Sequence, residues 1–248
     1  MTLEAENIRL ADWPVAILAG GLAQRMRPIT ETIPKALVAV AGEPFLAHQL
    51  RLLYGAGFRH VVICAGYLGE MIESTFGTGA GLGLQIEYCF DWPRLLGTGG
   101  ALRQALPVLG ERFFVLYGDS YLPIDYRQAA LTFTTCNKAA LMTVFRNEGR
   151  WDTSNVRFEA GRILAYDKNH PTPEMRYIDY GLGIFRSEVF DLWPAQQPFD
   201  LAEVYRRLLV ENQLCGYEVS QRFYEIGSPE GLAELDAFLQ QQPAIIRS

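Results

Sequence analysis

Short runs of almost purely apolar residues recur along the first half of the chain, and they constrain the fold more than any other feature. These runs are PVAILA (14–19), HVVICAG (60–66), LQIEYCF (84–90) and RFFVLYGD (112–119). Strands that are apolar on both faces are typical of parallel sheets covered by helices on both sides. Stretches with helical spacing of apolar residues separate them, at 43–56, 67–76 and 98–109. This alternation predicts an α/β fold with a mixed, mostly parallel, Rossmann-like sheet flanked by helices.

The second half of the chain is richer in strands. Runs 138–146 and 177–185 are expected to be strands, and 156–167 is expected to be a hairpin with a glycine in its turn. A helix is expected from Asp200 to about Asn212, because Asp200 and Glu203 have capping-box spacing. Pro229 suits the first turn of a last helix, 229–240. These patterns predict a strand-rich extension of the sheet.

The organisation of the chain indicates one folding unit. The sequence contains no internal repeat, no low-complexity linker and no clear boundary between its halves. We therefore interpret residues 1–248 as a single domain, with one half at about 14–135 and the other at 136–240.

Charge and hydropathy exclude several classes of function. The chain has 22 Lys and Arg against 28 Asp and Glu, a net charge of −6, and no long basic run, so nucleic acid is not an expected partner. No stretch approaches the roughly 18 apolar residues of a membrane span, so no membrane association is expected. The acidic N-terminal stretch is unlike a signal peptide, and the four cysteines are far apart. We therefore expect a cytoplasmic protein.

The stretch LAGGLAQRMRPITETIPK (18–35) has the features of a phosphate-binding loop. Gly20 and Gly21 directly follow the first predicted strand, and glycines let backbone N–H groups approach a phosphate closely. Arg25 and Lys35 supply cations, and the prolines between them stiffen the connection. The pattern is neither a Walker loop nor the dinucleotide fingerprint, because the glycine and lysine spacings differ.

These residues resemble the signature loop of the sugar-1-phosphate nucleotidylyltransferases, which runs Ala-Gly-Gly-x-x-x-Arg-Met-Arg-Pro and then Pro-Lys-Ala-Leu. Other segments resemble later parts of that family in the same order, namely LGTGGALRQAL (96–106), VLYGDS (115–120), AYDKN (165–169), DYGLGIF (179–185) and YEIGSPEGL (224–232). The resemblance covers nearly the whole chain. The length is similar to that of the short single-domain members, which include heptose-1-phosphate and mannose-1-phosphate guanylyltransferases and N-acetylmuramate-1-phosphate uridylyltransferases.

The resemblance implies an enzyme of the EC 2.7.7 type that converts a nucleoside triphosphate and a sugar 1-phosphate into a nucleoside diphosphate sugar and pyrophosphate, aided by Mg²⁺. The first half of the chain would bind the nucleotide and the second half the sugar. The resemblance assigns Arg25 and Lys35 to catalysis and Asp119 and Glu225 to the metal. The implied nucleotide-binding residues are Ala19, Gly20, Gly21, Arg25, Thr98, Gly99 and Gly118, and the implied sugar-phosphate residues are Lys168, Asp179 and Gly181.

The chain departs from the family pattern at several positions. Ala23 stands where members usually have a third glycine, and Gly181 stands where many have asparagine. Glu225 replaces the usual aspartate, and its extra methylene group moves the carboxylate oxygens by more than about one ångström. Four aromatic residues are candidates either for a sugar pocket or for the core, namely Trp92, Trp151, Tyr177 and Tyr180.

Several functional hypotheses remain open at the level of the sequence. The overall pattern favours GTP with a heptose or mannose acceptor, and UTP is the alternative. A non-catalytic regulatory protein that binds nucleotide sugars would be compatible with the departures from the pattern. A transferase for a non-sugar acceptor ranks lower, because the spacing from Arg27-Pro28 to Pro34-Lys35 differs from that of the molybdenum-cofactor group.

Overall fold

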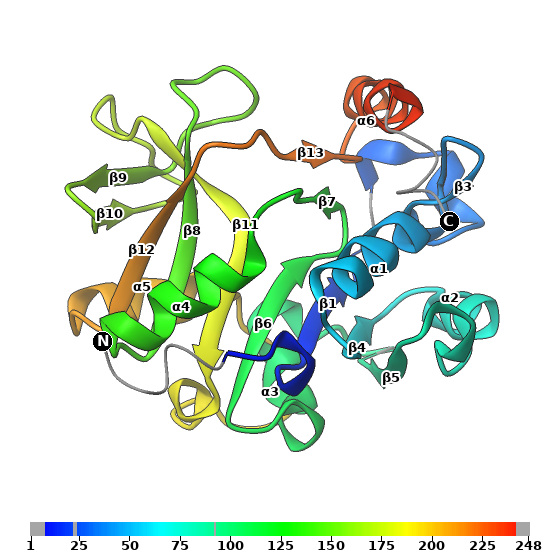
Figure 1. Ribbon diagram of the computed structural model, residues 1–248, viewed down its shortest axis with the longest axis horizontal. Helices are drawn as coiled ribbons and strands as arrows, with labels where there is room; N and C mark the ends of the chain where they lie inside the picture. The colour runs from blue at the N-terminus through cyan, green and yellow to red at the C-terminus, as the bar shows by residue number, and fades with distance from the viewer. Residues whose placement is uncertain (1–7, 22–23, 92, 242–248) are drawn as a thin grey trace.

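The computed structural model describes residues 8–21, 24–91 and 93–241 of the 248-residue chain. Within these residues, nine strands form one sheet with the order β10-β9-β11-β6-β1-β4-β5, and β8 pairs with both β11 and β12 (Figure 1). Helices lie on both faces of the sheet. The predicted fold class, a mixed sheet flanked by helices, is therefore confirmed.

The first half of the chain forms the parallel part of the sheet. Its strands are β1 (Val15–Ala19), β4 (His60–Ala65), β5 (Gln85–Phe90) and β6 (Arg112–Tyr117), and its helices are α1 (Phe45–Ala56), α2 (Gly69–Phe76) and α3 (Gly97–Leu109). β1 lies between β4 and β6 and is parallel to both. Each of these elements lies within two residues of the position expected from the apolar pattern.

The second half extends the same sheet beyond β6. β11 (Tyr177–Arg186) runs antiparallel to β6 and also pairs with β8 (Ala140–Arg146). The hairpin of β9 (Val156–Glu159) and β10 (Arg162–Tyr166) forms one edge. α5 (Leu201–Val210) begins with the predicted capping box of Asp200 and Glu203. The strand-rich extension therefore shares one sheet with the first half.

Several elements were not predicted. They are the helix α4 (Tyr126–Cys136), the strand β12 (Leu214–Val219), the two-residue strands β2 (Ala39–Val40), β3 (Glu43–Pro44), β7 (Ser120–Tyr121) and β13 (Tyr224–Glu225), and the 3₁₀ turns η2 (Leu10–Asp12), η3 (Gln24–Met26), η4 (Ile29–Glu31), η5 (Lys35–Leu37), η6 (Ala80–Leu82) and η7 (Ser187–Phe190). A local signal for α4 exists, because the Asp125 side chain accepts a hydrogen bond from the Gln128 amide at the helix N-terminus.

Alternating strand residues build a separate core on each face of the sheet. Val15 and Ile17 of β1 pack with α1, α2 and α4 on one face, whereas Ala16 packs with α3 and α5 on the other. This division follows from the two-residue repeat of a strand. Burial on both faces explains why the central strands have almost no polar residues.

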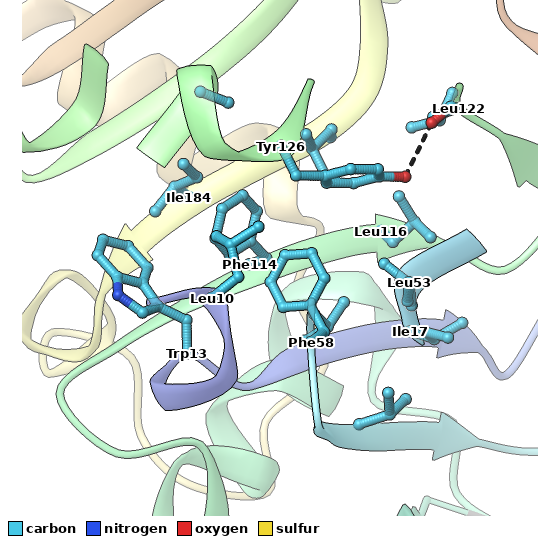
Figure 2. Close-up of a cluster of buried hydrophobic side chains, with 14 of the residues drawn as sticks. Leu10, Trp13, Ile17, Leu53, Phe58, Phe114, Leu116, Leu122, Tyr126 and Ile184 are labelled. Atoms are coloured by element: carbon cyan, nitrogen blue, oxygen red, sulfur yellow. Dashed lines mark hydrogen bonds between the residues drawn. The ribbon is translucent and has the colours of Figure 1, made fainter. Parts of the chain in front are cut away.

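Aromatic side chains dominate the first of these cores (Figure 2). The ring of Phe58 lies edge-on to Phe114 at 5.0 Å and to Tyr126 at 5.5 Å between centroids. The Tyr126 hydroxyl donates a hydrogen bond of 2.8 Å to the backbone oxygen of Leu122, so its one polar group is satisfied inside the core. Trp13 lies at the edge of the same cluster and packs against Phe114.

The C-terminal helix returns to the first half of the chain. α6 (Pro229–Gln241) packs through Leu235 and Leu239 against Phe45 and Val40, and the small β7–β13 sheet contributes Tyr121 to this cluster. In Figure 1, β13 and α6 lie above α1, far from β12, which precedes them in the chain. Among the helices of the described residues, none is both long and apolar enough to span a bilayer.

The N-terminus of α3 is fastened to the segment that precedes α5. The Gly99 amide donates a 3.0 Å hydrogen bond to the Phe199 backbone oxygen. Gly97 has a φ of +70°, and a Cβ atom there would lie 2.6 Å from the same oxygen. Only glycine adopts this positive φ without strain and also avoids a clash with the Phe199 oxygen without a backbone shift.

We expect the Gly97→Ala substitution to lower the free energy of unfolding by about 1–3 kcal/mol, because alanine would be strained and would clash with backbone. Gly55 is the matched control, since it also lies in a helix and a Cβ atom there would meet nothing within 4 Å. Gly55→Ala should be neutral or stabilising by up to about 1 kcal/mol. Urea denaturation of both variants checks this, and an equal loss of stability would contradict the explanation.

Candidate active site

A cavity of about 630 Å³ opens at the carboxyl ends of β1, β4 and β6. Open α/β sheets bind ligands at this edge. Eight of the predicted site residues line it: Ala19, Gly20, Gly21, Arg25, Lys35, Thr98, Gly118 and Asp119. The volume is within the range of sites for small molecules and cofactors. The structure therefore brings the glycine loop, both cations and the first acid together.

Lys35 and Asp119 form a direct ion pair in this cavity. The Lys35 ammonium donates a hydrogen bond of 2.8 Å to Asp119 Oδ2. Pro34 is extended, with φ −66° and ψ 146°, and the 3₁₀ turn η5 begins at Lys35 directly after it. The loop therefore turns back towards the end of β6, as the stiffening prolines predicted. The pair places a cation and a carboxylate at one end of the cavity.

The two predicted metal carboxylates come from neighbouring segments, Asp119 from the turn between β6 and β7 and Glu225 from β13. Glu225 of β13 is paired in register with Ser120 of β7, and the Ile226 amide donates a 3.0 Å hydrogen bond to the Asp119 backbone oxygen. Burial raises the pKa of the Glu225 carboxyl, and the nearby charges of Asp119 and Asp152 raise it further. These effects indicate a half-buried acidic site that a bound cation would stabilise.

Arg25 reaches the same acidic site from the glycine loop. A Cβ atom on Gly227 would lie 3.4 Å from Arg25 Nη2 and 3.7 Å from Glu225 Oε1. The arginine and the glutamate therefore both border Gly227. The charges of Lys35 and Arg25 act on the pKa of Glu225 in the lowering direction, against the effect of burial.

The donor set of this site fits Mg²⁺. Magnesium prefers carboxylate, water and phosphate oxygens and rarely occupies a cage made of protein ligands alone. Asp119 and Glu225 supply two carboxylates beside the cavity. Within residues 8–21, 24–91 and 93–241, His, Cys, Asp and Glu side chains form no group of three that could hold a metal. Such a pair suits an ion whose other ligands are phosphate oxygens and water.

Lys168 lies beyond the end of this cavity, next to Tyr117. The Lys168 ammonium donates a 3.2 Å hydrogen bond to the Tyr117 hydroxyl, and it lies 3.8 Å from Asp179 Oδ2. Burial alone would lower the pKa of Lys168, but Tyr117 and Asp179 outweigh it and raise this pKa. Burial also raises the pKa of Tyr117 to about 12, so its hydroxyl stays protonated at neutral pH.

Asp179 was predicted to contact the sugar, which stays a prediction, and the structure shows the partners that its side chain has within the protein. Its side chain is only 3% exposed. Its oxygens accept hydrogen bonds from the Gly181 amide at 3.1 Å and from the Tyr166 hydroxyl at 3.4 Å. Asp179 therefore faces Lys168 and the interior, and its geometry suits a positioning role for Lys168.

Gly181 has a backbone reason to be glycine. Its φ is +95°, and a Cβ atom would lie 3.4 Å from Ser120 Oγ and from a ring carbon of Tyr117. The pairing of β11 with β8 is irregular between Asp179 and Gly183 at this point. The glycine that this chain has at position 181, where many family members have asparagine, thus coincides with the irregular path of β11 next to β6.

Thr98 and Gly99 differ in their placement. Thr98 lines the cavity, and its hydroxyl oxygen accepts a 2.8 Å hydrogen bond from the Leu201 amide at the start of α5. Gly99 is buried, and a Cβ atom there would lie 2.2 Å from the ring of Phe199. The Gly99 amide is already bonded to Phe199, so the structure gives Gly99 a packing role, and its contact with the nucleotide stays a prediction.

Sequence reasoning missed Asp91, which follows β5 and lines the cavity. Its Oδ2 accepts a 2.9 Å hydrogen bond from the Leu96 amide. Its Oδ1 is buried and has no hydrogen-bond partner among the described residues. Burial raises the pKa of this carboxyl. Its position directly after an apolar strand was the signal that could have found it.

The aromatic candidates for the sugar pocket differ in burial and in their partners. Tyr180 is 2% exposed and belongs to the core, and Tyr177 packs edge-on against Phe158. Trp151 is 43% exposed and stacks on a cation. Trp92 and Ala23 lie outside the described residues, so their predictions are not tested.

Residues 15–242 match the protein family described as Nucleotidyl transferase. N-acetylmuramate alpha-1-phosphate uridylyltransferase of Neisseria meningitidis serogroup B is 33% identical over 227 residues, 89% of this chain and 96% of that protein. Mannose-1-phosphate guanylyltransferase of Mycobacterium tuberculosis is 31% identical over 239 residues, 92% of this chain and 66% of that protein. A Bacillus anthracis crystal structure, described as a glucose-1-phosphate thymidylyltransferase, superimposes with a TM-score of 0.83, covering 93% of this chain and 96% of that chain at 22% identity.

The acidic site predicts a pH-dependent stability. The folded state raises the pKa of Glu225 above its unfolded value, so ionisation of this carboxyl is less favourable in the folded protein. The penalty is absent below the ordinary glutamate pKa and grows as pH rises through the raised pKa. In metal-free buffer, Glu225→Gln should therefore raise Tm at pH 7 by about 2–4 °C, and the gain should vanish near pH 4.

Glu230→Gln is the matched control, because Glu230 is exposed in the first turn of α6. It should not change this pH dependence. Thermal denaturation in EDTA between pH 4 and pH 8 checks both variants. A lower Tm for Glu225→Gln at pH 7 would contradict the assignment of Glu225 to this half-buried acidic site.

Proposed function

The chain belongs to the nucleotidyl transferase family, and we propose that it transfers a nucleotidyl group from a nucleoside triphosphate to a sugar 1-phosphate and releases pyrophosphate. One observation carries the proposal: two cations and a carboxylate, Arg25, Lys35 and Asp119, meet in one cavity at the ends of two parallel strands. Such a site combines charge neutralisation with positioning, which is what phosphoryl-group transfer requires.

The glycine loop and the two cations act on the triphosphate. Backbone N–H groups of Gly20 and Gly21 approach the phosphates, and Arg25 and Lys35 neutralise their charge. An oxygen of the sugar 1-phosphate attacks the α-phosphorus, and a new P–O bond forms there. The bond from the α-phosphorus to the bridging oxygen of the β-phosphate breaks, and pyrophosphate leaves with the electron pair. The cations stabilise the charge that collects on the leaving oxygen.

Asp119 and Glu225 are the residues that would hold Mg²⁺. When bound, this ion would neutralise phosphate charge and orient the reacting oxygens. The two-residue strands β7 and β13 fix the carboxylates relative to each other through the Ile226–Asp119 backbone hydrogen bond. Lys35, already paired with Asp119, holds that carboxylate in place before the substrate arrives.

Lys168 is the residue that would bind the phosphate of the sugar 1-phosphate. It stands beside Tyr117, which lines the cavity, so it lies at the border between the nucleotide and acceptor sides. The buried carboxylate of Asp179 keeps Lys168 charged and oriented. Asp179 and Gly181 thus shape the acceptor side indirectly, Asp179 through Lys168 and Gly181 through Tyr117.

GTP with a heptose or mannose 1-phosphate is the favoured substrate pair, and Asp91 supports this choice of base. Asp91 lines the cavity, and an ionised carboxylate is purely a hydrogen-bond acceptor. Guanine carries two adjacent donors, N1–H and the 2-amino group, on its Watson–Crick edge. No other common base presents two adjacent donors on that edge. The similarity to the mycobacterial mannose-1-phosphate guanylyltransferase agrees with this proposal.

UTP is the second candidate, and one finding favours it. One relative that the chain matches over nearly its full length is an N-acetylmuramate alpha-1-phosphate uridylyltransferase. Uracil carries one donor, N3–H, between two carbonyl groups, and a single carboxylate oxygen could accept from it. The cytoplasmic location expected from the sequence stays a prediction.

Pyrophosphate release tests the proposed function. Purified protein with Mg²⁺ is incubated with each of GTP, UTP, CTP, ATP and dTTP, together with a panel of hexose, heptose and N-acetylmuramate 1-phosphates. We expect release with GTP and a heptose or mannose 1-phosphate, and a loss of at least about 100-fold in kcat for Lys35→Met. Lys138→Met, a surface lysine that bonds Asn212, is the matched control and should be near wild type. No release in folded protein would favour a non-catalytic nucleotide-sugar-binding protein.

The Asp91→Asn substitution tests the base assignment separately. Removing the charged acceptor should lower kcat/KM for GTP by about 10–100-fold, which corresponds to one charge-assisted hydrogen bond. The KM for the sugar 1-phosphate should change little, because Asp91 lies on the nucleotide side. An unchanged kcat/KM for GTP would contradict a contact between Asp91 and the base.

A further inference from the structure

Helix α1 carries a glutamine on the apolar face that it packs against the sheet. Leu46, Leu50 and Leu53 of this helix are fully buried in the first core. Gln49 comes three residues after Leu46 and four before Leu53, so it shares their side of the helix, and it is only 1% exposed. A buried amide lowers stability unless its polar atoms find hydrogen-bond partners. The partners of Gln49 therefore indicate what the residue does at this position.

The side-chain nitrogen of Gln49 bonds two main-chain oxygens where β6 ends and β7 begins. It donates a hydrogen bond of 3.0 Å to the Tyr117 backbone oxygen and one of 2.7 Å to the Ser120 backbone oxygen. These two residues flank Gly118 and Asp119. A single amide group therefore closes the turn that carries the first predicted metal carboxylate.

Main-chain hydrogen bonds from two other segments hold the inner residues of this turn. The Gly118 amide donates a 2.9 Å hydrogen bond to the Leu18 backbone oxygen of β1, and the Ile226 amide donates one of 3.0 Å to the Asp119 backbone oxygen. The turn is thus anchored by α1, by β1 and by the segment after β13. Of these three anchors, that of Gln49 uses a side chain, so a substitution can remove it and leave the main chain intact.

The anchored turn also orients the Asp119 carboxylate. Its Oδ1 accepts a 3.2 Å hydrogen bond from the Ser120 hydroxyl, and its Oδ2 accepts one of 2.8 Å from the Lys35 ammonium. Because Gln49 holds the main chain of Ser120, movement of the turn would displace both the carboxylate and one of its two partners. Hydrogen bonds that orient the groups around a metal typically account for 10–100-fold in metal affinity or activity.

Packing alone does not account for a glutamine at this position. Gln49 Oε1 is buried and has no hydrogen-bond partner among the described residues. An apolar side chain of similar length would fill the same space without leaving a buried acceptor unsatisfied. What the glutamine adds is the pair of hydrogen bonds to Tyr117 and Ser120.

We propose that Gln49 is a positioning residue of the active site, whose side-chain amide holds the turn that presents Asp119 to the metal ion. The proposal rests on the proposed function and concerns a residue that lies outside the loops with cations and acids. Gln49 does not touch the substrates. It acts through the main chain, and it keeps the carboxylate in place before the metal and the triphosphate bind.

Gln49→Met tests this role, because methionine has nearly the length of glutamine and no N–H groups. Mn²⁺ alone is titrated into the protein and followed by electron paramagnetic resonance, and kinetics are measured with the substrate pair that the wild type uses. We expect the Kd for Mn²⁺ to rise about tenfold and kcat to fall about 10–100-fold. A tenfold higher Mg²⁺ concentration should restore part of the lost rate, which it would not do for a misfolded protein.

Amide hydrogen exchange reports the turn itself. The segment 117–121 should exchange faster in Gln49→Met than in the wild type, because its main chain loses two anchors. Exchange in β4 should stay the same. Unchanged exchange in the turn, or faster exchange with unchanged Mn²⁺ affinity and kcat, would overturn the proposal.

Gln49→Asn is the second variant, and it provides the test if Gln49→Met does not fold. It keeps the amide but shortens the side chain by one carbon–carbon bond, about 1.5 Å, so that it cannot reach both oxygens. Its Mn²⁺ affinity should fall in the same direction. An affinity equal to that of the wild type would contradict the positioning role.

Gln240→Met is the matched control. Gln240 is also a helical glutamine whose side chain donates a hydrogen bond, but it is exposed in α6 and bonds Asp236 of the same helix. It should leave Mn²⁺ affinity, kcat and exchange of the turn unchanged. Losses equal to those of Gln49→Met would indicate a general loss of stability and would overturn the proposal.

The Mn²⁺ titration and the exchange measurement separate this inference from the proposed function, because neither needs turnover. A weaker Mn²⁺ affinity and a faster-exchanging turn in Gln49→Met, with no pyrophosphate release by the wild type, would support the positioning role at the metal site and refute the transferase activity alone. Pyrophosphate release by the wild type, with Gln49→Met equal to it in kcat and Mn²⁺ affinity, would refute the positioning role alone.

Discussion

The parallel register of β1 and β6 is the constraint on which the site depends. Leu18 lies opposite Tyr117, and the Gly118 amide continues the pairing with a 2.9 Å hydrogen bond to the Leu18 backbone oxygen. Both strands therefore end at the same level of the sheet, and the loops that follow them face each other. A Cβ atom at Gly118 would lie 2.6 Å from that same oxygen, so the register tolerates only glycine at this position. A slip of one residue would separate the phosphate loop from Asp119.

Much of this architecture follows from local pattern. The apolar strands of the first half and the helices between them were predictable because burial on both faces leaves almost no polar residues in a parallel strand. The meeting of the glycine loop, Arg25 and Lys35 at one cavity was predictable, because glycines directly after a buried strand, followed by cations on a proline-stiffened connection, form a recognisable pattern. Lys35 is the clearest case. The prolines before it in the sequence indicated that the chain returns towards the end of β6, and the ion pair of Lys35 with Asp119 shows that it does.

What could not be predicted depends on contacts between distant parts of the chain. α4 has alanines and threonines in place of a strong apolar stripe, and it is stabilised by packing against β8 and β12. Strands of two residues such as β13 have no periodicity to detect, and β13 is defined by its pairing with β7, in which Tyr224 lies opposite Tyr121 and Glu225 opposite Ser120. Asp91 was missed because a single acid after a strand is common, and its unpartnered oxygen is visible only once the cavity is formed. The packing role of Gly99 was missed because a sequence does not reveal that its amide is bonded to Phe199.

The return of β13 to the first half of the molecule has a consequence for the order in which the protein is made. A ribosome completes the phosphate loop, β6 and Asp119 when the second half of the chain is still untranslated. Across the small β7–β13 sheet, Glu225 pairs with Ser120 and the Ile226 amide bonds the Asp119 backbone oxygen, so the partners of this segment come more than a hundred positions later in synthesis. A nascent chain that has folded its parallel strands therefore holds half of an acidic pair, and the other half arrives with the last tenth of the sequence. The acidic pair is therefore complete only when translation is almost over.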